Sequence, residues 1–206
     1  CRPRLPWAMA LPVFKNDPQL ILPILDKLKQ DDSLYVRRSV ANNLNDIAKD
    51  NPDTVLEWCS NNIGRYPDTD WIIKHGCRTL LKQANPKAMR LFGYADSSLV
   101  LVENLAIENK RLAIGDELKF SFRLSTNREQ LSKLRVEYIV DYVKANGRRS
   151  PKVFKSSESD YIQSEISFER KHSFRQMSTR KHYPGEHKLS IRVNGDIKAS
   201  TCFSLH

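Results

Sequence analysis

The 206-residue sequence lacks the features that mark a membrane-spanning, disulfide-stabilised or zinc-binding chain. No apolar run approaches the ~20 residues that a helix needs to span a bilayer. The four cysteines lie far apart and form no Cys-x-x-Cys pair, which disfavours a disulfide framework and a zinc site. We therefore interpret Cys1, Cys59, Cys77 and Cys202 as reduced, mostly buried thiols of an intracellular protein.

Glycine is also scarce, and several kinds of reactive site are missing with it. None of the seven glycines falls in a phosphate-binding loop, and no Ser/His/Asp nucleophile motif is present. His172, His182 and His187 share one half of the chain, but no pair has the i, i+4 or Cys-linked spacing of a zinc site. The sequence therefore predicts neither a bound metal nor another cofactor.

The start of the sequence lacks an initiator methionine, so we expect residues to be missing at the N-terminus. Pro3, Pro6 and Pro12 interrupt the basic, apolar and small-residue order of a signal peptide. We therefore predict a cytoplasmic protein with no membrane partner.

Positive charge is what the sequence has in excess. The net charge is +10, with 14 basic against 11 acidic residues in 1–96 and 20 against 13 in 97–206. Such an excess favours a polyanionic partner, because neutralising phosphates releases counterions. Solvated basic faces explain the same charge, so composition alone leaves both interpretations open.

The first half of the chain has helical periodicity, with apolar residues recurring every three to four positions. Pro18, Pro52 and Pro86 each follow Asp or Asn, which is the order of a helix N-cap and first turn. The pattern predicts helices near 18–29, 33–49, 52–63, 69–83 and 86–92.

An internal similarity links two of these predicted helices. Residues 36–44 align with residues 73–81 at an offset of about 37, which is within the range of helical-pair repeats. Such pairs bury their apolar faces only by stacking. We therefore predict a HEAT-like α-helical repeat solenoid over residues 1–96, truncated at its N-terminus.

The second half has short segments rich in β-branched and aromatic residues, separated by turn signals such as Asn146-Gly147 and Asn194-Gly195. The predicted strands are 99–107, 117–124, 134–143, 166–169, 187–193 and 199–205. Six or seven antiparallel strands in this length predict an immunoglobulin-like β-sandwich over residues 97–206.

The helix predicted at 33–49 has a polar stripe opposite its apolar one. Val36, Val40, Leu44 and Ile47 share the apolar side, and Arg38, Asn42, Asn45, Asp46 and Lys49 share the other. Cations and amides suit phosphate oxygens, whereas a carboxylate repels them. Asp46 is therefore a candidate for stabilising positive charge that develops on a substrate. The alternative is an ion pair with Arg38 or Lys49 on a solvated face.

A second unusual feature is the proline-stiffened segment Arg2-Pro3-Arg4-Leu5-Pro6-Trp7. Two arginines offer forks for phosphate, and a tryptophan is suited to stacking on a base or sugar. A core tryptophan that anchors a linker is the alternative interpretation of Trp7.

These strings resemble the AlkC branch of the HEAT-like alkylpurine DNA glycosylases, and the resemblance covers nearly the whole chain. It is carried by residues 1–7, 35–49, 73–82, 142–147, 151–154 and 180–185. The resemblance implies hydrolysis of the N-glycosidic bond of N3-alkylated bases, such as 3-methyladenine and 3-methylcytosine, without full base flipping. Carried over by position, the resemblance implies that Trp7 lies against the lesion's sugar and that Asp46 supplies the carboxylate facing C1′.

The resemblance also implies double-stranded DNA containing alkylated bases as the partner of a monomeric, nucleoid-associated enzyme. The family places a further active-site glutamate in a Ser-Glu-Gly stretch that precedes Arg2, and this sequence begins after that stretch. Predicted DNA contacts, each of which has a solvated surface charge or amide as its alternative, are Arg2, Arg4, Arg37, Arg38, Asn42, Lys74, Arg78, Lys82, Lys144, Arg148, Arg149 and Arg180.

Two other classes of function remain open at this point. A non-catalytic module that holds DNA or a protein partner fits a helical repeat followed by a sandwich, because fold alone does not decide function. An adhesin-like extracellular sandwich is disfavoured by the absent disulfide pattern and by the basic helical half.

Overall fold

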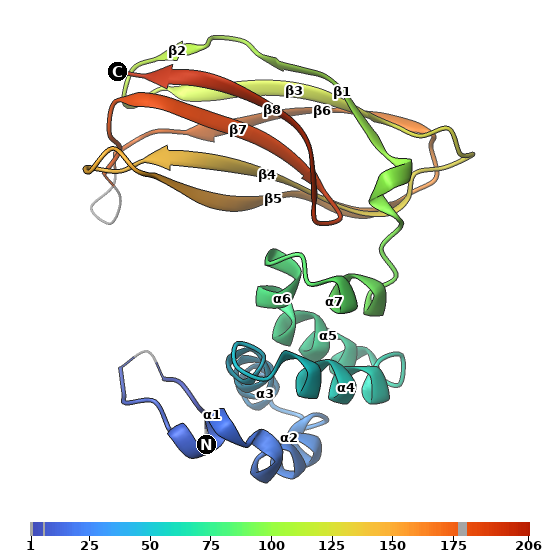
Figure 1. The fold of residues 1–206 in the computed structure, drawn as a ribbon. Helices are drawn as coiled ribbons and strands as arrows, with labels where there is room; N and C mark the ends of the chain where they lie inside the picture. The colour runs from blue at the N-terminus through green and yellow to red at the C-terminus, as the bar shows by residue number, and fades with distance from the viewer. Residues whose placement is uncertain (1, 6, 177–180) are drawn as a thin grey trace. The chain divides into compact units, whose positions relative to one another are not determined.

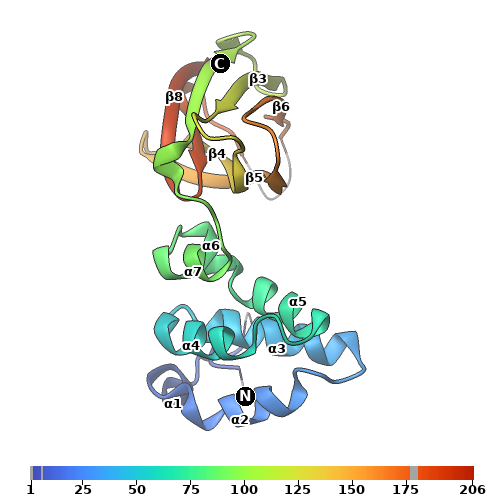
Figure 2. The same cartoon turned by 90° about the vertical axis from the view of Figure 1, so that its right-hand side faces the viewer.

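The computed structural model describes residues 2–5, 7–176 and 181–206 and divides into two compact units, Cys1–Phe92 and Gly93–His206 (Figures 1 and 2). Each unit has its own interior. Within the described residues, no helix is long and apolar enough to cross a membrane.

The first unit consists of short helices, most of which begin at a proline. Proline suits this position because its fixed φ fits the first turn and its missing N–H would be unpaired there anyway. The elements are α1 (Pro12–Asn16), η1 (Pro18–Leu20), α2 (Leu22–Leu28), α3 (Leu34–Ile47), α4 (Pro52–Asn62), α5 (Pro67–Gly76), α6 (Arg78–Lys82) and α7 (Pro86–Leu91).

Helix α3 is the centre of this unit and packs against α2, α4 and α5. Its residues Val40, Leu44 and Ile47 are fully buried, in agreement with the apolar stripe of the sequence. Helix α5 comes close to α3 at Gly76, where an added Cβ would lie 3.1 Å from the Leu44 Cβ. A small residue at this point therefore sets the spacing of the two helices.

The predicted fold class is wrong in its helical half, because no long repeat solenoid is present in the part of the chain that the structure describes. The seven α-helices there have at most 14 residues. The helix expected over 69–83 is broken at Cys77, so that α5 and α6 are separate. The similarity on which the solenoid was based has two copies, whereas a stable stack needs at least three.

The second unit is built from two sheets, one with three strands in the order β1-β3-β6 and one with five in the order β2-β8-β7-β4-β5. Its elements are η2 (Ser97–Leu99), β1 (Leu101–Ile107), β2 (Arg111–Leu112), β3 (Glu117–Ser125), β4 (Ser132–Val143), β5 (Arg149–Tyr161), β6 (Glu165–Ser173), β7 (Gly185–Val193) and β8 (Asp196–Leu205). All pairings are antiparallel except that of β2 with β8, which is parallel.

The two sheets share one apolar core between their inner faces (Figure 1). Strand β3 shows the expected alternation, with Leu118, Phe120 and Phe122 pointing inward. The segment before β1 is bonded to this unit, since the Ala95 N–H donates to the Lys133 carbonyl and the Ala95 carbonyl accepts from the Asn194 amide. The β-unit is therefore ordered from its first residues.

The interior of the β-unit also contains buried polar groups that are hydrogen-bonded to one another. Glu137 is buried and accepts hydrogen bonds from Arg135 and Arg192, with its two carboxylate oxygens divided between the two guanidinium groups. His172 lies between the hydroxyls of Tyr138 and Tyr142, at 3.1 and 2.5 Å. In the described part of the chain, no three His, Cys, Asp or Glu side chains come together in a metal-ligating group.

Candidate functional site

Asp46 lies near the C-terminal end of α3, and its carboxylate is held by two cations. Arg2 donates from Nε and Nη2 to Oδ2, at 2.9 and 2.5 Å, and Lys49 donates from Nζ to Oδ1 at 3.0 Å. The residue is only 3% exposed. The expected ion pair with Lys49 is therefore present, but it is buried rather than solvated, and the second cation is Arg2 instead of Arg38.

A second ion pair holds the N-terminal segment against the C-terminal end of α3. Arg4 donates to both carboxylate oxygens of Asp50, one helical turn after Asp46, at 3.1 and 2.5 Å. Trp7, further along the segment, is 98% exposed. The interpretation of Trp7 as a core anchor is therefore wrong, and its ring is open to contact.

Residues from α5 and α6 extend the polar surface of α3. Arg78 donates from Nη2 to the Asn42 Oδ1 at 3.0 Å and from Nη1 to the His75 carbonyl at 2.6 Å. Burial lowers the pKa of Arg78, while the charge of Asp46 raises it and that of Arg2 lowers it. The Arg78 guanidinium is thus within electrostatic reach of the Asp46 ion pair.

An aromatic pair completes this surface at α5. The rings of Trp71 and His75 stack with centroids 5.2 Å apart and planes inclined by 7°. Burial, together with the charges of Arg78 and Arg38, lowers the pKa of His75. We call the set Arg2, Arg38, Asn42, Asp46, Lys49, Trp71, His75 and Arg78 the polar face.

Besides Arg4, three predicted contacts of the helical unit lie outside the polar face. Arg37 donates to the carbonyls of Asp31 and Asp32, at 2.7 and 2.9 Å, and pairs with Asp68 at 3.3 Å, so it ties a loop to two helices. Lys74 places its ammonium 5.1 Å from the centre of the Phe92 ring. Lys82 ends α6 and is exposed.

The basic loop of the β-unit joins β4 to β5. Lys144 and Arg148 are exposed there, and Gly147 has the positive φ of 75° that the turn requires. Arg149 is already paired with Glu186 at 2.6 Å. Arg180 lies outside the described residues.

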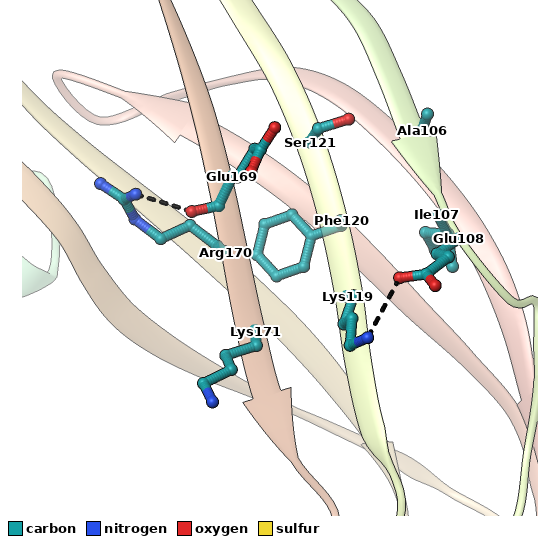
Figure 3. A pocket seen from close by; sticks show the side chains of 9 residues that line it. All are labelled: Ala106, Ile107, Glu108, Lys119, Phe120, Ser121, Glu169, Arg170 and Lys171. Atoms are coloured by element: carbon teal, nitrogen blue, oxygen red, sulfur yellow. Dashed lines mark hydrogen bonds and ion pairs between the residues drawn. The ribbon is translucent and has the colours of Figure 1, made fainter.

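The outer side of the three-stranded sheet carries a shallow cleft of about 590 Å³ (Figure 3). Lys119 pairs with Glu108 at 3.5 Å, and Arg170 donates to the Glu169 carbonyl at 2.8 Å. Lys171 is the cross-strand neighbour of Lys119 and pairs with Glu117 at 3.6 Å. These three cations all have local partners and none of the predicted site residues lines the cleft, so the polar face is the better candidate for the functional site.

Sequence reasoning missed Trp71 and His75. Their spacing could have revealed them, because residues four positions apart, such as Trp71 and His75, lie on one side of a helix, and Arg78 follows on that side. The pairing of Arg2 with Asp46 gave no comparable signal, since 44 positions separate the two residues in the chain.

Together these features define a protein of two units, in which a short-helix unit with an ion-paired carboxylate on its polar face precedes a two-sheet β-unit. The chain belongs to the family described as uncharacterised protein YhaZ, C-terminal Ig-like domain, whose model matches residues 101–206.

Two known proteins are similar over nearly the whole chain. The uncharacterized protein YhaZ of Bacillus subtilis strain 168 is 48% identical over 205 residues, which are 99% of this chain and 57% of that protein. The solved structure of the alkylpurine DNA glycosylase AlkC of Pseudomonas fluorescens, bound to DNA containing an abasic site analog, is 40% identical. It matches with a TM-score of 0.93 over 100% of this chain and 57% of that one. The chain thus spans a little over half the length of either protein.

Proposed function

We propose that this chain is part of a DNA-repair glycosylase that hydrolyses the N-glycosidic bond of N3-alkylated bases, such as 3-methyladenine and 3-methylcytosine, without extruding them fully from the duplex. The observation that carries the proposal is the 40% identity, over the whole chain, to a glycosylase solved on DNA with an abasic site analog. An abasic site is what such a hydrolysis leaves behind. A glycosylase of chromosomal DNA would work in the cytoplasm at the nucleoid.

In the proposed reaction, water adds to C1′ of the deoxyribose while the bond from C1′ to the base nitrogen breaks. The electron pair of that bond neutralises the cationic base, and the proton lost by water is released to solvent. Positive charge therefore builds on the sugar in the transition state. A fixed carboxylate close to C1′ stabilises that charge, which is the role we assign to Asp46, and the exposed ring of Trp7 would pack against the sugar.

The ion pairs of Asp46 bear directly on this role. Two cations now compensate the carboxylate, which weakens its field at any neighbouring atom. Arg2 is the partner that a DNA phosphate would compete for, because its guanidinium forms equally good bonds with phosphate. We infer that phosphate binding draws Arg2 away and leaves Asp46 with Lys49 as its one cation.

The proposed partner is a double-stranded DNA that contains alkylated bases, bound by one copy of the protein. Cations on or beside the polar face are the proposed phosphate contacts of the helical unit, namely Arg2, Arg4, Arg38 and Arg78, with Asn42 as an amide contact. Lys82, at the end of α6, is proposed with them, and Lys144, Arg148 and Arg180 are proposed for the β-unit. Arg37 and Lys74, whose internal contacts lie outside the polar face, and Arg149, which is paired with Glu186, rank behind these.

The test is base release from methylated duplex DNA by the intact gene product, with the freed bases separated by chromatography. We expect 3-methyladenine and 3-methylcytosine in excess of a protein-free control. DNA binding without any release would overturn the glycosylase and support a non-catalytic DNA-binding module. The paired state of Asp46 is the observation that keeps this second function under consideration.

A further inference from the structure

Trp71 is partly exposed to solvent although it lies on a packed helix. It is 38% exposed, and its neighbours in the sequence, Ile72 and Ile73, are fully buried. One indole face is covered by the parallel ring of His75. The pair therefore forms a flat, rigid surface that the core of the unit does not use.

Cations flank this aromatic pair on the side toward α3. Arg78 donates to the His75 carbonyl and to the Asn42 side chain, and its guanidinium also lies within electrostatic reach of Asp46 and Arg2. Arg38 is near enough for its charge to act on the His75 ring. Asp70, which directly precedes Trp71, accepts a hydrogen bond from the Gly64 N–H at 2.7 Å, and Asp68 is paired with Arg37 at 3.3 Å.

A nucleic acid strand has the two chemical features that match this surface. Where the base stack of a duplex is interrupted, as beside an abasic site, a nucleotide presents an open flat π-face and, next to it, a phosphate. Stacking on an aromatic side chain beside basic groups is a common way to hold nucleotides whatever their sequence. An apolar peptide segment would match the aromatic ring but would leave the guanidinium groups without an anionic partner.

We propose that Trp71, supported by His75, is a further DNA-contact residue whose exposed ring stacks on a nucleobase left open beside the abasic site, while Arg38 and Arg78 engage the flanking phosphates. This proposal rests on the DNA binding assigned under the proposed function. It adds a contact on α5, the helix that packs against the α3 helix of Asp46. That contact would fix the register of the strand relative to the carboxylate.

The test compares affinities for a short duplex that carries a single abasic-site analog. Trp71→Ala should bind about tenfold more weakly or worse, as loss of one stacked base implies. Trp71→Phe keeps an aromatic face and should bind within a few-fold of the unaltered protein. Tyr66→Ala is the matched control, because Tyr66 is also exposed and caps the same helix but lies outside the polar face.

Fluorescence gives a second readout that does not depend on the stability of the alanine variant. Trp58 is buried, so DNA should quench mainly the emission of Trp7 and Trp71, and the quenching should be smaller in Trp71→Phe. Equal affinity of Trp71→Ala and the unaltered protein, with base release intact, would overturn this contact and leave the glycosylase standing. Absence of DNA binding by the unaltered protein would overturn both.

Discussion

Asp46 shows how a single residue joins the stability of the helical unit to its proposed chemistry. A buried carboxylate without a partner would cost several kcal/mol. Arg2 and Lys49 offset much of that cost through three hydrogen bonds, whereas a carboxylate offers about four acceptor sites. The residue is therefore stable where it lies and still has acceptor capacity.

Replacing Arg2 should destabilise the helical unit more than replacing Lys49. Arg2→Gln leaves the buried Asp46 with one partner, and we expect the free energy of unfolding to fall by about 1–3 kcal/mol. Lys49 is more exposed, so Lys49→Gln should cost less than about 1 kcal/mol. Urea unfolding of both variants measures the difference. A larger loss for Lys49→Gln would show that Arg2 is not the main partner.

At this scale the sequence predicted some environments well and others poorly. The buried positions Val40, Leu44 and Ile47 follow from helical periodicity, which depends on local spacing alone. Asn45 and Asp46 were expected on the polar side and are nevertheless buried, because Thr79 and Arg2 cover them. Contacts between residues so far apart in the chain leave no periodic trace.

At the scale of the elements, helices α3 and α5 pack closely against each other at Gly76. At Gly76 the neighbouring atom is the Cβ of Leu44, which is tied to the backbone and cannot rotate away. The helices must therefore separate if a larger residue is introduced. This geometry explains why Gly76, a residue of low helix propensity, is the last residue of α5.

Gly76→Ala should therefore destabilise the protein although alanine favours helix formation. The gain in helix propensity is at most about 1 kcal/mol, whereas overpacking costs about 1–3 kcal/mol. We expect a lower melting temperature by calorimetry. Asn61→Ala, at an exposed position of α4, is the control and should leave it nearly unchanged. A Gly76→Ala protein that melts higher would refute close packing at this position.

In the β-unit, the buried His187 makes stability depend on pH. Its Nδ1 lies 3.1 Å from the Gly185 carbonyl and its Nε2 accepts from the Val143 N–H, so the neutral ring fits the site. Burial lowers the pKa of His187, the Gly185 carbonyl raises it, and the charge of Arg149 lowers it. The unfolded ring, with a pKa near 6.5, then binds a proton that the folded ring refuses.

The free energy of unfolding should therefore fall as the pH drops below about 6.5, by at most about 1.4 kcal/mol per pH unit for this group. His187→Gln should reduce that slope in urea titrations run at several pH values. His206→Gln, at an exposed terminal residue, serves as the control. Identical slopes for His187→Gln and the unaltered protein would remove His187 as the cause.

The strands were predicted unevenly, for a reason that concerns their place in the sheet. Strand β3 alternates apolar and polar residues because one side meets the core. Strand β5 is at the edge of the five-stranded sheet and is largely polar, so it gave no alternation and was not predicted. Strand β2 has two residues, which is too short for any pattern.

For the whole molecule, the net charge of +10 is the property most relevant to DNA. Binding to duplex DNA should weaken with salt, and log K should fall linearly with log salt concentration at a slope of about −0.9 per phosphate contacted. An apolar protein interface would lack this dependence. The affinity and its salt slope together therefore distinguish a DNA-binding module from a protein-binding module.

Removing one proposed phosphate contact should change the slope by a defined amount. Arg38→Gln should reduce its magnitude by about one, with weaker binding to every sequence. Lys110→Gln, which removes an exposed charge of the β-unit outside the proposed contacts, should leave it unchanged. Equal slopes for Arg38→Gln and the unaltered protein would exclude Arg38 from the contacts.

The most direct test of the proposed chemistry is the single-turnover rate of 3-methyladenine release by the intact gene product and its Asp46→Asn variant. The amide keeps the shape of the side chain and removes its charge. We predict that Asp46→Asn releases the base at least about 100-fold more slowly. Its affinity for abasic-site DNA should stay within a few-fold of that of the unaltered protein. Release by Asp46→Asn at the unaltered rate would contradict the role of Asp46 in stabilising the sugar cation.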